Sequence, residues 1–124
     1  LSLVLMRHRG LDVVAAQLGG LGLWEETLEH LAGKDIYMDT SCCNDVVPAS
    51  AMGALLARHD RSRIIFGSDY PLFSPKSERS SLTRLLAQLR VSDSTILGNG
   101  NRLAQSLQPG GFAGRPPAPG IDFS

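Results

Sequence analysis

Short apolar runs alternate along the chain with segments of helical periodicity. Residues 13–16, 36–39 and 64–66 are apolar or rich in β-forming side chains. Unbroken apolar runs of this length are typical of strands that are buried on both faces of a sheet. Each run is followed by a loop that contains glycine or proline and then by an amphipathic segment. The pattern therefore predicts three strand-helix pairs in succession.

The predicted helices are recognised by apolar residues that recur three or four positions apart. These residues are Trp24, Leu28 and Leu31 in the first helix; Ala51, Met52, Leu55 and Leu56 in the second; and Leu82, Leu85, Leu86 and Leu89 in the third. A short final helix, capped by Ser92 or Asp93, carries Ile96 and Leu97, and Leu103 continues it.

Successive strand-helix pairs indicate parallel strands joined by right-handed crossovers, and hence an α/β fold. A sheet of three parallel strands would leave two open edges. Further strands therefore either precede Leu1 in a longer protein, which the missing initial Met favours, or come from a second copy in a homo-oligomer. Residues 109–124 are rich in Pro and Gly and are predicted to form a disordered tail.

Composition and charge give no support for a nucleic-acid partner, a membrane segment, a disulfide framework or a cysteine zinc site. Lys+Arg 12 balances Asp+Glu 12, so charge gives no reason to expect nucleic acid or an anionic membrane surface. No stretch approaches the roughly 18 apolar residues of a membrane helix. The two cysteines, Cys42 and Cys43, are adjacent, which suits neither a disulfide framework nor a spaced zinc site. We therefore expect a reducing, cytoplasmic setting.

Asp69 is the strongest candidate for a catalytic or metal-binding residue. It follows the third predicted strand in the string Arg-Ile-Ile-Phe-Gly-Ser-Asp-Tyr-Pro, residues 63–71. A carboxylate just past the carboxyl end of a buried parallel strand projects into the face where α/β enzymes build their sites. Asp69 could therefore be a metal ligand or a general base, and it could equally cap the following loop or helix.

Four segments follow one another along the chain: residues 13–24 (VVAAQLGGLGLW), residues 36–41 (IYMDTS), residues 63–71, and Ile96-Leu97-Gly98 with Asn101-Arg102-Leu103. Together they resemble the C-terminal part of the amidohydrolase-related family, which includes the aminocarboxymuconate-semialdehyde and resorcylate decarboxylases. In chain order, they are similar to the sixth strand, the seventh strand, the eighth-strand motif and the last helix of that family. The resemblance extends over residues 11–107.

The resemblance implies that residues 1–108 are part of a (β/α)8 TIM barrel. It implies metal-dependent hydrolysis or non-oxidative decarboxylation of a small carboxylate or carbonyl substrate, with Asp69 binding a divalent metal, most often zinc. Gln17 stands where the family has a catalytic His, and its amide can hydrogen-bond the reacting group but cannot take up a proton near neutral pH. The remaining His ligands of the family would lie before Leu1. This chain alone is therefore expected to be inactive and not to hold the metal tightly.

Two other interpretations remain open. The chain could be a non-catalytic half-barrel that serves as a structural or binding module. It could also be a dinucleotide-binding domain, because Gly20-Leu21-Gly22 precedes a helix and Asp39 ends the next strand. The third glycine of that fingerprint, however, falls on Glu25.

The remaining polar residues are interpreted as structural or solvated. His8 and His59 are predicted to be surface residues, and Glu26 and His30 to form a solvated pair on a helix face. Asp39 is predicted to anchor its loop. Cys42 lies close to the expected mouth of the site, but no neighbouring base or cation would activate its thiol.

Overall fold

The computed structural model describes residues 1–107, so the predicted tail at residues 109–124 lies outside the described residues. The elements, in chain order, are α1 (Ser2–Arg7), β1 (Val14–Ala15), the 3-10 helix η1 (Ala16–Gly19), α2 (Trp24–His30), β2 (Tyr37–Asp39), α3 (Ala49–Arg58), the 3-10 helix η2 (Arg61–Arg63), β3 (Ile64–Ile65), α4 (Pro75–Gln88), α5 (Ser94–Leu97) and α6 (Asn99–Ser106). The three predicted strands are all present, although each is shorter than its apolar run.

The strands form a parallel sheet in the order β1-β2-β3. Val14 is opposite Tyr37 in the first pairing, and Met38 is opposite Ile64 in the second. Each strand is joined to the next by a helical crossover, which confirms the predicted α/β class. Within residues 1–107, the outer sides of β1 and β3 pair with no further strand.

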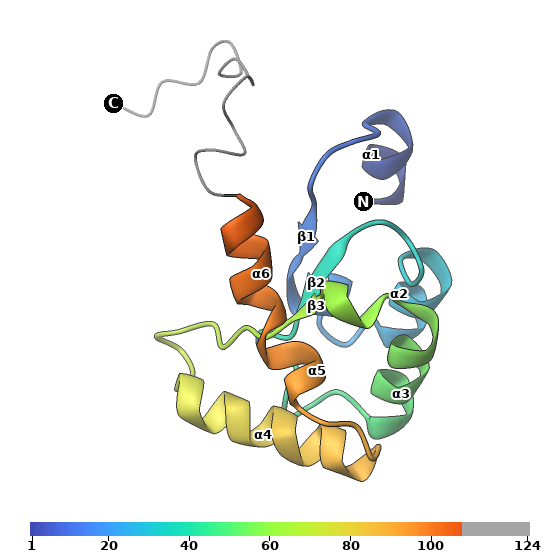
Figure 1. The fold of residues 1–124 in the computed structure, drawn as a ribbon. Coiled ribbons are helices and arrows are strands. Elements are labelled where there is room, and N and C mark those ends of the chain that lie inside the picture. Colours follow the sequence, from blue (N-terminus) through green and yellow to red (C-terminus); the bar gives the residue numbers. More distant parts are fainter. Residues whose placement is uncertain (108–124) are drawn as a thin grey trace.

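Helices surround this small sheet (Figure 1). The helix α2 packs against α3, and α3 packs against α4. The helices α5 and α6 both contact β3, so the C-terminal helices cover one side of that strand. The predicted final helix is divided in two, because α5 ends at Leu97 and α6 begins at Asn99.

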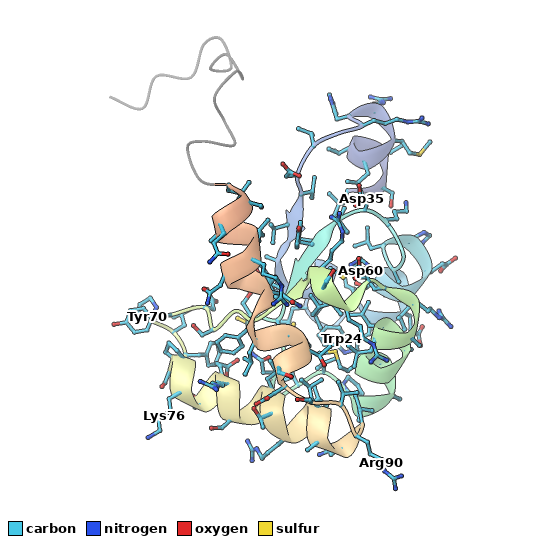
Figure 2. The ribbon with its side chains drawn as sticks, viewed as in Figure 1. Trp24, Asp35, Asp60, Tyr70, Lys76 and Arg90 are labelled. Carbon is cyan, nitrogen blue, oxygen red and sulfur yellow. The ribbon has the colours of Figure 1, made fainter. Side chains whose placement is uncertain are left out.

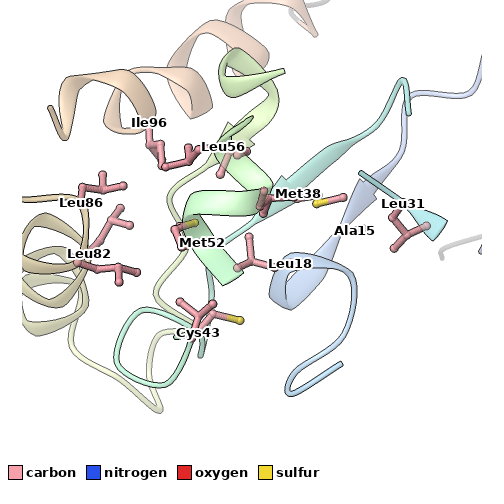
Figure 3. Close-up of a cluster of buried hydrophobic side chains, with 14 of the residues drawn as sticks. Ala15, Leu18, Leu31, Met38, Cys43, Met52, Leu56, Leu82, Leu86 and Ile96 are labelled. Atoms are coloured by element: carbon pink, nitrogen blue, oxygen red, sulfur yellow. The ribbon is translucent and has the colours of Figure 1, made fainter. Parts of the chain in front are cut away.

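The core lies between the sheet and the helices (Figure 3). Met38 from β2, Ile64 from β3, Leu82 and Leu86 from α4, and Ile96 from α5 are all 0% exposed. Burying one such side chain contributes about 1.5–3 kcal/mol relative to leaving it in water. The helix periodicities read from the sequence therefore identify the inner face of α4 correctly.

His59 is buried, with 4% of its surface exposed, so its predicted surface position is wrong. It caps the C-terminus of α3 and points into the fold. Its Nδ1 accepts the Gly33 N–H over 3.1 Å, and its Nε2 donates to the Ile36 carbonyl over 3.0 Å. Burial lowers the pKa of this imidazole, which favours the neutral form that these two bonds require.

Within residues 1–107, no helix combines the length and apolar character that crossing a membrane requires. The exposed apolar side chains include Leu3 and Met6 on α1 and Leu72 in the loop before α4. Scattered exposed residues of this kind are ordinary in folded proteins and need no partner to explain them.

Candidate functional site

The three parallel strands direct their carboxyl ends to the same edge of the sheet. The chain leaves β1 into Gln17, leaves β2 at Asp39 into Ser41 and Cys42, and leaves β3 through Gly67 to Asp69. This edge is where α/β folds assemble functional residues. The two site residues predicted from the sequence, Gln17 and Asp69, therefore lie on one edge.

Asp39 joins the loops that follow the first two strands. Its Oδ1 accepts the backbone N–H of Gln17 over 3.1 Å and that of Ser41 over 2.9 Å. It also accepts the hydroxyl of Ser41. These bonds confirm that Asp39 anchors its loop, and they bring the backbone of Gln17 against the end of β2.

Cys42 and Asp69 make the central contact of the site. Sγ of Cys42 lies 3.0 Å from Oδ2 of Asp69. The hydrogen bond to Asp69, and then partial burial and the negative charge of that carboxylate, raise the pKa of the Cys42 thiol, whereas a hydrogen bond with the Gln17 side chain acts in the opposite direction. The thiol is thus protonated near neutral pH and donates to Asp69, so the loops that follow the second and third strands meet at this contact.

These three residues share an unusual backbone conformation. The φ angles of Gln17, Cys42 and Asp69 are 55°, 59° and 57°, all in the left-handed region. Non-glycine residues seldom adopt this region, and those that do are concentrated at functional sites. Leu18 and Arg90 also have positive φ angles, so three of the five non-glycine residues of this kind among residues 1–107 lie at this edge.

The loop after Asp69 leaves the outer side of the site open to solvent. Asp69 itself is exposed. Tyr70 is 74% exposed and Leu72 is 77% exposed. Figure 2 shows Tyr70 at the outer end of this loop, away from the helices. A ligand could therefore reach the Asp69 carboxylate without any rearrangement of the core.

The donors at this edge do not by themselves fit a zinc ion. Zinc is held by three or four protein ligands. Among residues 1–107, no three His, Cys, Asp or Glu side chains are placed to hold a metal together. Asp69 offers one carboxylate, Cys42 is a protonated thiol, and His59 uses both ring nitrogens inside the fold. Any complete metal site would need ligands from beyond the described residues.

The structure also places the other polar residues that the sequence analysis singled out. Glu26 and His30 are exposed on α2, as expected for a solvated helix face. Cys43 is fully buried, and burial together with the charge of Asp39 raises the pKa of its thiol to about 12. Sequence reasoning missed the role of Cys42 as a hydrogen-bond donor to Asp69. The only available signal was its position just past the second strand.

The dinucleotide-binding interpretation is not favoured. Asp39, which would have to bind the ribose, is already engaged with Gln17 and Ser41. The first turn of α2, which would face the pyrophosphate, carries Glu25 and Glu26. Negative charges at that helix end oppose the binding of an anion.

Comparison with known proteins identifies one family. A family model described as amidohydrolase matches residues 1–95. No curated protein and no solved structure matches the chain. The match covers all three strands and most of the helices, including Gln17 and Asp69.

Proposed function

The chain belongs to the amidohydrolase family, and we propose that it supplies part of the active site of a metal-dependent hydrolase or non-oxidative decarboxylase. The family implies a TIM barrel, and its members commonly use divalent metals. In such barrels the active site lies at the carboxyl ends of the strands. The observation that carries the proposal is the hydrogen bond between Cys42 and Asp69 at that edge, beside the bond by which Asp39 holds the backbone of Gln17.

Asp69 is the residue to which we assign direct contact with the reacting centre. Its carboxylate is exposed, and one oxygen holds the Cys42 thiol while the other faces no hydrogen-bond donor within residues 1–107. In a complete barrel, Asp69 would be the ligand that this segment contributes to the metal, for which we propose zinc. Such an ion would supply Lewis-acid chemistry at this edge. The Asp69 carboxylate itself can exchange a proton with a neighbouring group.

Gln17 is assigned an orienting role. Its backbone is fixed at the end of β2 by the hydrogen bond to Asp39. An amide both donates and accepts hydrogen bonds, so Gln17 can hold the carboxylate or carbonyl of a small substrate. It cannot act as an acid or base near neutral pH, so proton transfer at this edge falls to Asp69.

The test replaces Asp69 by Asn in the protein encoded by the complete reading frame. The matched control is Asp12→Asn, which changes an exposed carboxylate before β1. Carbon dioxide release from 2,6-dihydroxybenzoate and hydrolysis of 4-nitrophenyl acetate serve as the two probes. Bound zinc is measured in parallel by mass spectrometry.

We expect Asp69→Asn to lower turnover of whichever probe is accepted by about a hundred-fold or more, since acid-base catalysis contributes about 10²–10⁴. Bound zinc should fall in the same variant, and Asp12→Asn should change neither quantity. Equal turnover and equal zinc content in both variants would overturn the proposed role of Asp69. If only decarboxylation responds, the lyase form of the proposal is the correct one.

A further inference from the structure

The turn that carries Asp69 is held through both backbone groups of Gly67. The Gly67 N–H donates to Oγ1 of Thr40, and the Gly67 carbonyl accepts Nδ2 of Asn44, each over 3.2 Å. A Cβ at Gly67 would approach Cβ of Ser41 to 3.1 Å, so the two loops are tightly packed here. Because only Ser68 separates Gly67 from Asp69, the position of Gly67 determines where the carboxylate lies.

Asn44 and Glu78 form a buried polar pair next to this turn. Asn44 is 3% exposed and Glu78 is 5% exposed. Nδ2 of Asn44 donates to Oε2 of Glu78 over 2.7 Å. The other buried residues of α4 are Ser81, Leu82, Leu85 and Leu86. A carboxylate on this face is unfavourable unless it is hydrogen-bonded, and an apolar residue would serve packing better.

Glu78 determines which end of the Asn44 amide faces the turn. A carboxylate accepts hydrogen bonds and donates none, so it admits only the NH₂ end of the amide. The second N–H of the same group then meets the Gly67 carbonyl. Among residues 1–107, Oδ1 of Asn44 has no hydrogen-bond partner, so the orientation is selected through the NH₂ group alone, by the Glu78 carboxylate together with the Gly67 carbonyl. Rotating the amide by half a turn would place Oδ1 against two other oxygens.

We propose that Asn44 and Glu78 are positioning residues for Asp69. Glu78 orients the Asn44 amide, the amide holds the Gly67 carbonyl, and Gly67 places the Asp69 carboxylate at the edge of the sheet. The proposal rests on the function proposed for Asp69. Neither Asn44 nor Glu78 contacts substrate in this scheme, because both are buried. Their effect is transmitted entirely through the backbone of the turn.

The first test measures the turn directly, by amide hydrogen exchange with mass spectrometry. Glu78→Leu removes the acceptor, and Glu78→Gln retains one because the Gln side-chain carbonyl can accept from Asn44. Glu29→Leu is the control, since Glu29 is an exposed residue of α2 with a side chain 75% exposed. Exchange is compared between residues 66–74, which contain the turn, and residues 49–58 of α3.

We expect Glu78→Leu to accelerate exchange in residues 66–74 by roughly ten-fold while residues 49–58 keep their wild-type rate. Glu78→Gln should match the wild type, because the acceptor and therefore the amide orientation are restored. Unchanged exchange in Glu78→Leu would overturn the proposal. Equal acceleration of exchange in residues 66–74 and 49–58 would also overturn it, because that result would mean global destabilisation. Equal acceleration in Glu78→Gln and Glu78→Leu would overturn it too, because the charge and not the amide orientation would then matter.

The second test measures turnover with the probe that the wild-type protein accepts. We expect Glu78→Leu to lower kcat/KM by about ten- to a hundred-fold, since small misplacements of catalytic groups have effects of this size. Glu78→Gln should restore most of the loss. If Asp69→Asn lowers turnover but Glu78→Leu does not, the positioning role fails and the proposed function stands. If Asp69→Asn has no effect, the proposed function fails, and the positioning role fails with it.

Discussion

Asn99 joins the C-terminal helices to the sheet, and replacing it by Ala should destabilise the chain strongly. The residue is 1% exposed at the start of α6. Its Nδ2 donates to the carbonyls of Ile64, Arg61 and Thr95 over 2.7, 2.8 and 2.9 Å. The Ile65 carbonyl pairs with β2 through the Thr40 N–H, so the preceding Ile64 carbonyl faces the outer side of β3. Asn99 thus supplies a side-chain donor to the outer side of β3.

The magnitude follows from these contacts. Leaving the buried Ile64 carbonyl unsatisfied costs about 1–3 kcal/mol, and the remaining hydrogen bonds contribute about 1 kcal/mol each. Because the amide has two N–H groups for three carbonyls, we expect a total loss of about 3 kcal/mol for Asn99→Ala. Asn99→Asp should be worse even though the Arg102 guanidinium, which donates to Oδ1 of Asn99, would remain paired, since a carboxylate would face three carbonyl oxygens with no proton to donate.

Urea unfolding followed by the fluorescence of Trp24, the single tryptophan, measures the free energy of unfolding. Asn101→Ala is the matched control, because Asn101 is exposed two residues further along α6. The reasoning is refuted if Asn99→Ala unfolds at the same urea concentration as Asn101→Ala. It is also refuted if Asn99→Asp is as stable as the wild type at neutral pH.

Two further predictions concern His59 and Gly19. Because burial lowers the pKa of His59 below 6.5, its neutral form contributes stability that is complete above pH 6.5 and is lost as the pH falls toward the folded-state pKa. The urea midpoint of the wild type should therefore decline as the pH is lowered from 7.5 to 5.5, and the midpoint of His59→Gln should change less. An equal change of the midpoint with pH in both proteins would contradict this. Gly19→Ala should cost about 1–3 kcal/mol, since its Cβ would meet Cδ1 of Leu31 at 2.5 Å with φ at +90°. Gly100→Ala, where a Cβ meets nothing within 4 Å, serves as control, and equal melting temperatures of the two variants would count against the clash.

The fold was predictable where periodicity carries the information. Leu82 and Leu86 are 0% exposed because residues four apart share a helix face, and that spacing is visible in the sequence. The parallel sheet follows similarly from alternating strands and helices. The burial of Asn99 was not predictable. Its side chain reaches carbonyls of Arg61 and Ile64, which lie 38 and 35 residues earlier.

His59 shows why polarity alone misplaces a residue. In the sequence it lies between Arg58 and Asp60, so a surface position is the natural inference. In the fold it finds a donor in Gly33 and an acceptor in Ile36, which offset the loss of water. Those partners lie 26 and 23 residues away, so the sequence around His59 does not predict them.

The candidate site shows the same division between local and distant information. Asp69 and Gln17 could be proposed because each follows a strand, and parallel strands share their carboxyl edge. Cys42 was set aside because no neighbour in sequence would activate its thiol, and that chemical judgement holds, since its pKa is raised. A thiol that is not activated can still donate a hydrogen bond, and the sequence did not predict the bond that Cys42 makes. Cys42 acts here as a donor to Asp69, 27 residues away, and this contact joins the loop after the second strand to the loop after the third.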